Sequence, residues 1–300
     1  LLGFAAFGIH DWAPSAARGL VTLGVILFIA EYLCRGLSLA WKLLIVSLAL
    51  TWRILGVTVV EGRPDIILGL FLAGGIVLVT ESNWLKSSWQ KQVIAGAFFG
   101  AALVCKPSMS PISLLLLVTT LCVASFVDVW RDRNTRKNLF YVNSYCLGTT
   151  LAVMAPYYLV HGRTAIRYFT DVIFGEGSEV WLVNLSLTGH AVFYLTGVGG
   201  EWLIGYHWLG IWVLFALISL LIFWRNHHAN LWQSARQEFP LPLGIMMVVT
   251  WFILSVPKTK GVYFGAALAG LFLFTAIQML VFFIHRYQEL AQTKYHFIVK

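Results

Sequence analysis

Long apolar stretches, separated by short polar connections, constrain this sequence more than any other feature. A helix needs about 20 mainly apolar residues to cross a bilayer, and nine stretches approach or reach that length. They cover residues 17–34, 40–60, 66–80, 92–105, 111–127, 139–159, 206–224, 240–256 and 262–284. The predicted fold is therefore all-α, a polytopic transmembrane helical bundle of about nine spans, with residues 1–300 forming a single transmembrane domain.

The composition agrees with an integral membrane protein. Apolar residues make up 59% of the 300 residues, charged residues make up 11%, and the mean hydropathy is +0.79. One water-soluble core cannot hide that much apolar surface. The net charge of +8 does not indicate a nucleic-acid partner, because the Lys and Arg residues are spread over short loops and do not gather on one polar face.

The distribution of Lys and Arg predicts the orientation, because short cytoplasmic loops carry the excess. One set of alternate connections holds the larger share: Arg35, Lys42, Lys86, Lys91, Arg131, Arg133, Arg136, Lys137, Arg225, Arg236, Arg286, Lys294 and Lys300. The other set holds Arg18, Arg63, Lys106, Arg163, Arg167, Lys258 and Lys260. This pattern predicts an external N-terminus and a cytoplasmic C-terminus, and it leads us to expect a further span before Leu1. The basic loop 128–138 is interpreted as a topology signal.

The external connection at about 160–205 is too long for a plain turn. It mixes aromatic residues such as Trp202 with acids such as Glu201. This mixture is typical of an amphipathic helix lying in the membrane interface, and a half-inserted segment near 188–198 is one form of it. A structural belt of interfacial aromatic residues is the alternative.

The stretch Glu61-Gly62-Arg63-Pro64-Asp65 places three charges between two apolar runs on the predicted outer side. Glu61 and Asp65 lie four residues apart, so they share a helix face or line one tight turn. Either arrangement lets both acids act on one cation or one nucleophile, and Arg63 can hold a phosphate or pair with an acid. The alternative is an interfacial cap, in which Asp65 favours the dipole of the helix that follows.

Three lysines lie on the same predicted outer side, although external loops usually carry few. Lys258 and Lys260 flank the polar interruption between two apolar runs, and Lys106 ends another run before Pro107. A lipid phosphate or pyrophosphate would explain these charges, since Lys binds phosphate as a point charge. Snorkelling of the side chains to lipid headgroups is the alternative explanation.

Motifs of soluble-type catalysis do not occur in a context that supports them. We find no GxSxG, HExxH, Walker or dinucleotide-binding pattern in such a context. The cysteines contain no CxxC pair, and each falls in or beside an apolar stretch, which favours buried thiols over a metal site.

Four segments, taken in order, resemble a known family. They are FGIHDWAPSAARGLVTLGVILFIAEYLCR, EGRPDIILGLFLAGGIVLV, AGAFFGAALVCKPSMSPISLLL and SVPKTKGVYFGAALAGLFLFTA. The combination resembles the polytopic GT-C glycosyltransferases, especially the protein mannosyltransferase and aminoarabinose transferase branch, which uses polyprenyl-phosphate sugars as donors. The resemblance covers nearly the whole chain.

The resemblance implies roles for particular residues. Asp65 matches the acidic position after the family's third span, and Lys106 matches the basic residue that ends a "KP" segment. Lys258 and Tyr263 match a turn near the donor phosphate. The assignment as a whole is catalytic for Asp65 and Glu61, and substrate-binding for Arg63, Lys106, Lys258, Lys260 and Tyr263.

The resemblance also implies the chemistry and the partners. A sugar on a polyprenyl phosphate would pass, with inversion, to an acceptor on the external face that is a protein, a lipid or a glycan. Some branches use a divalent metal, Mg²⁺ or Mn²⁺. The family's principal catalytic carboxylate lies in a first external loop that precedes Leu1, so a truncated and inactive sequence is expected. The expected location is the plasma membrane of a bacterium or archaeon.

Two other functions remain open from the residues. A polytopic transporter or lipid flippase also needs many spans and outward charges, although the absence of a visible internal repeat weighs against a transporter. A membrane protein with a structural or assembly role is the third possibility.

Overall fold

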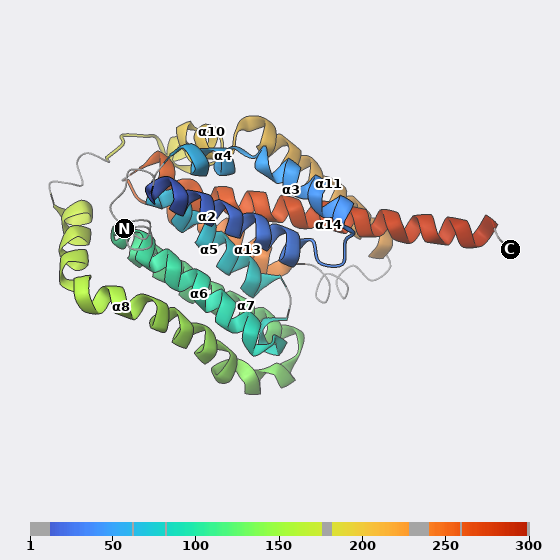
Figure 1. Cartoon of the computed structure of the whole chain (residues 1–300), viewed down its shortest axis with the longest axis horizontal. Coiled ribbons are helices and arrows are strands. Elements are labelled where there is room, and N and C mark those ends of the chain that lie inside the picture. The colour runs from blue at the N-terminus through green and yellow to red at the C-terminus, as the bar shows by residue number, and fades with distance from the viewer. Residues whose placement is uncertain are drawn as a thin grey trace. The chain divides into compact units, whose positions relative to one another are not determined.

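The protein is described by a computed structural model, in which the regular elements of the described residues are helices (Figure 1). The described residues are 13–61, 63–81, 83–175, 182–227, 240–258 and 260–298, and for 172–174, 226–227 and 289–298 the backbone alone is described. Each of the nine apolar stretches coincides with one or two of the helices. The prediction of an all-α fold is therefore confirmed.

The first half of the chain contains α2 (Ala13–Leu27), the π-helix η1 (Phe28–Leu33), α3 (Leu39–Leu50), α4 (Arg53–Val60), α5 (Pro64–Thr80), η2 (Trp84–Lys86), α6 (Trp89–Cys105), η3 (Pro107–Met109), α7 (Ser110–Arg131) and η4 (Arg133–Asn138). The second half contains α8 (Leu139–Phe174), α9 (Leu187–Val192), α10 (Val198–Leu203), α11 (Tyr206–His227), α13 (Leu241–Ser255), η6 (Val262–Gly265) and α14 (Ala266–Ile298).

Several of these helices suit a membrane by length and composition. Four helical segments of the described chain are long and apolar enough to cross one: Ala13–Leu33, Pro107–Arg131, Tyr206–Arg225 and Val262–Gln288. The pair α3 and α4, bent by 68°, makes a fifth if it counts as one span, while α5 and α13 are apolar but shorter. The chain is thus an integral membrane protein, whereas nine spans and the direction of the termini stay predictions.

The chain divides into two compact units, which are described separately. The first unit comprises Leu1–Gly62, Tyr206–Ala229 and Phe272–Lys300, and the second comprises Arg63–Gly205 and Asn230–Leu271. Helix α14 contributes residues to both.

Aromatic residues join the helices of the first unit. Trp52, in the bend between α3 and α4, stacks on Trp208 of α11 with the ring centroids 4.9 Å apart. The Trp212 indole of α11 donates a hydrogen bond of 2.7 Å to the Thr275 hydroxyl of α14. These contacts hold α3, α11 and the later part of α14 together.

Helix α5 is the centre of the second unit. It is apolar on every side, and nearly all of its residues are buried against α6, α7, α13 and the start of η6 and α14. Close packing requires a small residue at Gly69, where a Cβ would lie 2.4 Å from Ala266. The same holds where α6 meets α8, since a Cβ at Gly96 would lie 2.3 Å from the Cys146 carbonyl oxygen. Figure 1 shows α6 running alongside α8.

The second unit has two opposite ends at which several helices begin or end. At one end α5 begins, α6 ends and α7 begins, and η6 packs against α5. At the other end α5 ends, α6 begins, α7 ends, and η2 packs against η4. The 22 residues of α7 separate the two ends by about 33 Å, which is close to the thickness of a bilayer's hydrocarbon core.

The segment predicted as an external interfacial element contains three helical parts. Helix α8 continues past the predicted end of its apolar stretch to Phe174, and the short helices α9 and α10 follow. Residues 176–181 lie outside the described residues. An interfacial position for this segment stays a prediction.

Candidate active site

Asp65 lies in the first turn of α5, and its side chain is directed into the second unit. Arg63 is the N-cap with extended backbone angles, and Pro64 occupies the first helical position, where its missing N–H is no loss. A carboxylate in the first turn also interacts favourably with the helix dipole. Asp65 is 5% exposed, so this is a buried acid rather than a solvated cap.

Lys106 provides the positive charge that the buried acid needs. It follows the last residue of α6 and precedes Pro107, and the proline favours the extended backbone that Lys106 adopts. Its ammonium donates a hydrogen bond to Asp65 Oδ1 and forms an ion pair with it. The same nitrogen lies 4.9 Å from the centroid of the Phe264 ring, within cation–π range. Two sequence positions far apart therefore form one charged pair beside an aromatic face.

Arg63 lies at the exposed edge of the same end of the unit. Its guanidinium carbon is 4.2 Å from the centroid of the Tyr263 ring, in η6. The Trp202 ring of α10 meets Tyr263 edge to face at 6.4 Å. The result is a row formed by Arg63, Tyr263 and Trp202, with the guanidinium at its exposed end.

Lys260 is directed to the end of α13. It is 4% exposed, and its ammonium donates hydrogen bonds of 2.8 Å to the carbonyl oxygens of Leu254 and Ser255. These carbonyls belong to the last turn of α13, where a cation is favourable. Burial lowers the pKa of Lys260 to about 8. In this structure Lys260 therefore holds the turn in place.

Tyr194 completes the environment of that turn. Its ring lies 5.2 Å from the Lys260 ammonium, and its hydroxyl donates a hydrogen bond of 3.2 Å to the Gly261 carbonyl oxygen. Burial raises the pKa of the Tyr194 phenol. Lys258 is exposed in the same turn, and its carbonyl oxygen accepts the Val183 N–H at 3.3 Å. The turn is thus tied to the segment before α9.

The structure brings together four of the residues predicted for the site: Arg63, Asp65, Lys106 and Tyr263. Lys258 and Lys260 lie in the turn that precedes η6 and are not part of the Asp65–Lys106 ion pair. Glu61 ends α4 in the first unit, with its N–H bonded to the Val57 carbonyl at 2.7 Å. The predicted pairing of Glu61 with Asp65 in one site stays a prediction.

The sequence did not single out Phe264 or Tyr194, and it gave Trp202 only as an interfacial aromatic residue. A signal for Phe264 exists, because two aromatic residues directly follow the Lys258–Lys260 turn. Which of them faces a cation depends on the packing of η6 on α5, which a single sequence does not reveal.

The described residues do not fit a divalent metal well. Among the ranges described above, no group of three or more His, Cys, Asp or Glu residues could hold a metal ion. Asp65, the buried acid of this site, already accepts the Lys106 ammonium.

Comparison with known proteins shows a similarity in fold but no match in sequence. No protein-family model matches the sequence, and no curated protein matches it. Among solved structures, the chain is similar to ArnT from Cupriavidus metallidurans bound to undecaprenyl phosphate, with a TM-score of 0.54 and 17% identity over 92% of this chain and 48% of that chain. Its fold is similar to that of this half of ArnT.

The apo state of the same ArnT gives nearly the same result, with a TM-score of 0.53 and 19% identity over 92% of this chain and 47% of that chain. The chain thus spans about half the length of the structures it matches. This similarity supports the predicted helical membrane fold over that half of ArnT.

Proposed function

We propose that this protein is a membrane glycosyltransferase that moves a sugar from a polyprenyl-phosphate donor to an acceptor on the external face, with inversion at the sugar carbon. The observation that carries the proposal is the buried Asp65–Lys106 pair, with Arg63 beside it, at one end of the second unit. The shared fold with a protein solved with undecaprenyl phosphate supports the choice of donor, since that molecule is a polyprenyl phosphate.

A buried ion pair is costly to form, so its presence favours a functional role. Removing two charges from water costs several kcal/mol per ion, and mutual attraction repays this only with good geometry. Asp65 carries the one charge in α5, which is otherwise apolar. Charged groups buried near a membrane face are typical of substrate sites.

Lys106 and Arg63 are the proposed ligands of the donor phosphate. An ammonium has three protons, and Lys106 uses one on Asp65, so an entering phosphate can take another. The exposed Arg63 guanidinium offers the fork of donors that suits a phosphate. The Lys106 ammonium is then shared between Asp65 and the phosphate, and the remaining lone pairs of the Asp65 carboxylate stay open to the acceptor.

The proposed transfer then runs in one displacement. The acceptor's oxygen or nitrogen forms a bond to the anomeric carbon, on the face opposite the phosphate. The bond from that carbon to the phosphate oxygen breaks, and the polyprenyl phosphate leaves with the electron pair. The acceptor's proton passes to a carboxylate, for which Asp65 is proposed, with Glu61 as a second acid. Lys106 and Arg63 stabilise the charge on the departing phosphate.

The turn before η6 has two proposed roles. Lys260 positions the turn through the carbonyls of α13, while the exposed Lys258 is available to the donor's phosphate. Tyr263 lies between Arg63 and Trp202 and limits the site on the aromatic side.

A kinetic separation of the two charged residues tests this proposal. The full-length protein is reconstituted with radiolabelled polyprenyl-phosphate sugars, and release of polyprenyl phosphate in the presence of membrane acceptors is measured. We expect Lys106→Gln to raise KM for the donor at least tenfold and Asp65→Asn to lower kcat about 100-fold. Undiminished release in Asp65→Asn would overturn the assigned role.

A matched control uses the exposed pair at the other end of the unit. Lys86→Gln and Asp132→Asn change the same residue types and should leave both kinetic constants unchanged. Movement of labelled donor across the membrane without any release of polyprenyl phosphate would instead support a lipid flippase and contradict the transferase.

A further inference from the structure

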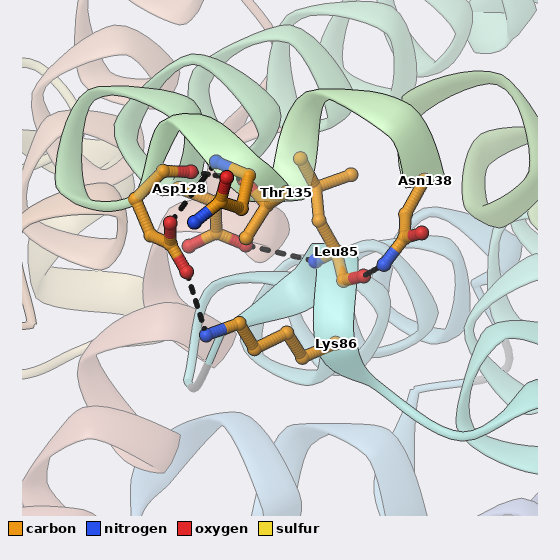
Figure 2. Close-up of polar contacts among 7 residues, drawn as sticks. Leu85, Lys86, Asp128, Thr135 and Asn138 are labelled. Carbon is orange, nitrogen blue, oxygen red and sulfur yellow. Dashed lines mark hydrogen bonds and ion pairs between the residues drawn. The ribbon is translucent and has the colours of Figure 1, made fainter.

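The loop between α7 and α8 uses its acids internally (Figure 2). The buried Asp128, at the end of α7, accepts the Leu85 N–H at 2.8 Å. Asp132 accepts the Lys86 ammonium at 2.9 Å and the Asn134 N–H at 3.0 Å. Both carboxylates of the loop are thereby directed toward η2 or the loop's own backbone.

Further hydrogen bonds fix the shape of η4. The Thr135 hydroxyl, on a buried residue, donates to the Asp132 carbonyl oxygen at 2.7 Å. The Asn138 amide donates to the Leu85 carbonyl oxygen at 3.0 Å, so η2 is bonded on both sides (Figure 2). Trp84, also in η2, donates from its indole to Asn143 of α8 at 2.9 Å. A loop that served only as a positively charged topology signal would not need hydrogen bonds that fix its conformation.

The cations of the same loop are directed to the outside. Arg133, Arg136 and Lys137 are all exposed, and within the described residues none of the three forms an ion pair. Because η4 has three residues per turn, Arg133 and Arg136 lie on the same side of it. Two neighbouring guanidiniums are suited to hold one phosphate group.

Apolar side chains stand next to these cations. Phe140, in the first turn of α8, is 82% exposed, and its neighbours Leu139 and Tyr141 are 41% and 58% exposed. An exposed apolar group beside cations is the arrangement found where a protein meets lipid headgroups. We call Arg133, Arg136, Lys137 and Phe140 the η4 surface.

We propose that the η4 surface is a binding site for the phosphate of an anionic phospholipid headgroup. Arg133 and Arg136 hold the phosphate, Lys137 adds charge, and Phe140 enters the apolar layer next to the headgroup. The hydrogen bonds to η2 fix the conformation of the loop that carries these side chains. The site lies at the end of α7 opposite Asp65 and is independent of the proposed sugar transfer. The hydrogen bond from Lys86 holds the pKa of Asp132 below its usual range, so that acid stays ionised and paired near neutral pH.

The test measures lipid binding to the whole purified chain in a neutral detergent. Short-chain phosphatidylglycerol is titrated in, phosphatidylcholine serves as the zwitterionic control, and bound lipid is counted by native mass spectrometry. We expect saturable binding of phosphatidylglycerol that weakens with salt, and roughly tenfold weaker binding in the double variant Arg133→Gln/Arg136→Gln. The matched control, Arg163→Gln/Arg167→Gln, removes two exposed arginines of α8 and should bind like the wild type.

Two further measurements test whether the acyl chains and the shape of η4 contribute to phosphatidylglycerol binding. Glycerol 3-phosphate, added as a soluble competitor, should compete only weakly because it lacks the acyl chains that reach Phe140. Thr135→Val keeps every charge but removes the hydrogen bond to Asp132, and it should weaken binding several-fold. Equal losses in both double variants, full competition by glycerol 3-phosphate, or wild-type binding in Thr135→Val would overturn the proposal.

Discussion

The second unit contains two lysine–aspartate pairs, one at each end of α7, and their surroundings differ sharply. The side chains of Asp65 and Lys106 are 6% and 19% exposed, whereas those of Asp132 and Lys86 are 37% and 53% exposed. The exposed pair gains little because water already solvates both charges. The buried pair has lost that solvation and depends on its partner. The same two residue types can therefore hold a loop in one place and keep a carboxylate buried at the candidate site in the other.

The largest effect that separates the two pairs should come from removing one lysine. Lys106→Met leaves the Asp65 carboxylate buried without its cation, which should lower the free energy of unfolding by about 3–5 kcal/mol. Lys86→Met should cost less than about 1 kcal/mol. Unfolding in mixed detergent micelles measures both, and equal losses would show that the pairs do not differ in the way described.

A smaller effect should separate the two acids at the far end of α7. Asp128→Ala leaves the Leu85 N–H unsatisfied, and we expect a loss of about 1–3 kcal/mol in the free energy of unfolding. Asp132→Ala removes only exposed contacts, which water already screens, and should cost clearly less. The same unfolding assay compares them. A larger loss in Asp132→Ala would mean that the exposed ion pair, and not the buried bond to η2, holds the loop.

An effect of similar or smaller size concerns the arginines at each end. Arg63 lies over the Tyr263 ring, so Arg63→Gln should lower the free energy of unfolding by about 0.5–1 kcal/mol. Arg133 is exposed and has no such ring contact among the described residues, so Arg133→Gln should leave stability unchanged. Thermal unfolding of the two variants side by side distinguishes them. Equal stability of both would indicate that the Arg63–Tyr263 contact contributes nothing.

The smallest effect should appear as a pH dependence of the exposed pair. The Lys86 hydrogen bond lowers the pKa of Asp132, so its contribution to stability is present above the unfolded pKa of about 4. That contribution is lost as the pH falls through the lowered pKa of the folded state. The Tm difference between the wild type and Asp132→Asn should thus be positive at pH 7 and disappear as the pH falls through that lowered pKa. A difference that stays constant over this range would contradict the pairing.

The long helices could be predicted from the sequence because the length of each apolar stretch indicates them. All nine apolar stretches coincide with helices, but the end of α8 was missed by 15 residues, from the predicted end at 159 to Phe174. The last turns of α8 carry Arg163, Arg167 and Asp171, so they are helical without being apolar. Hydropathy detects a helix only where lipid or core demands apolar side chains.

The candidate site could be predicted from the sequence only in part. The charges of Asp65, Lys106 and Arg63 drew attention because they interrupt apolar runs, and they do lie at one end of one unit. That Lys106 pairs with Asp65 depends on how far α5 and α6 slide along each other, which spacing in one sequence does not determine. Lys260 shows the same limit, since its charge suggested a phosphate but its ammonium caps α13.

The most direct test of the central claim compares one substitution at the two pairs. In the full-length protein, the rate at which polyprenyl phosphate is released from a labelled polyprenyl-phosphate sugar is measured for Asp65→Asn and for Asp132→Asn. The account predicts a rate about 100-fold below wild type for Asp65→Asn and a wild-type rate for Asp132→Asn. Equal rates in the two variants would contradict it.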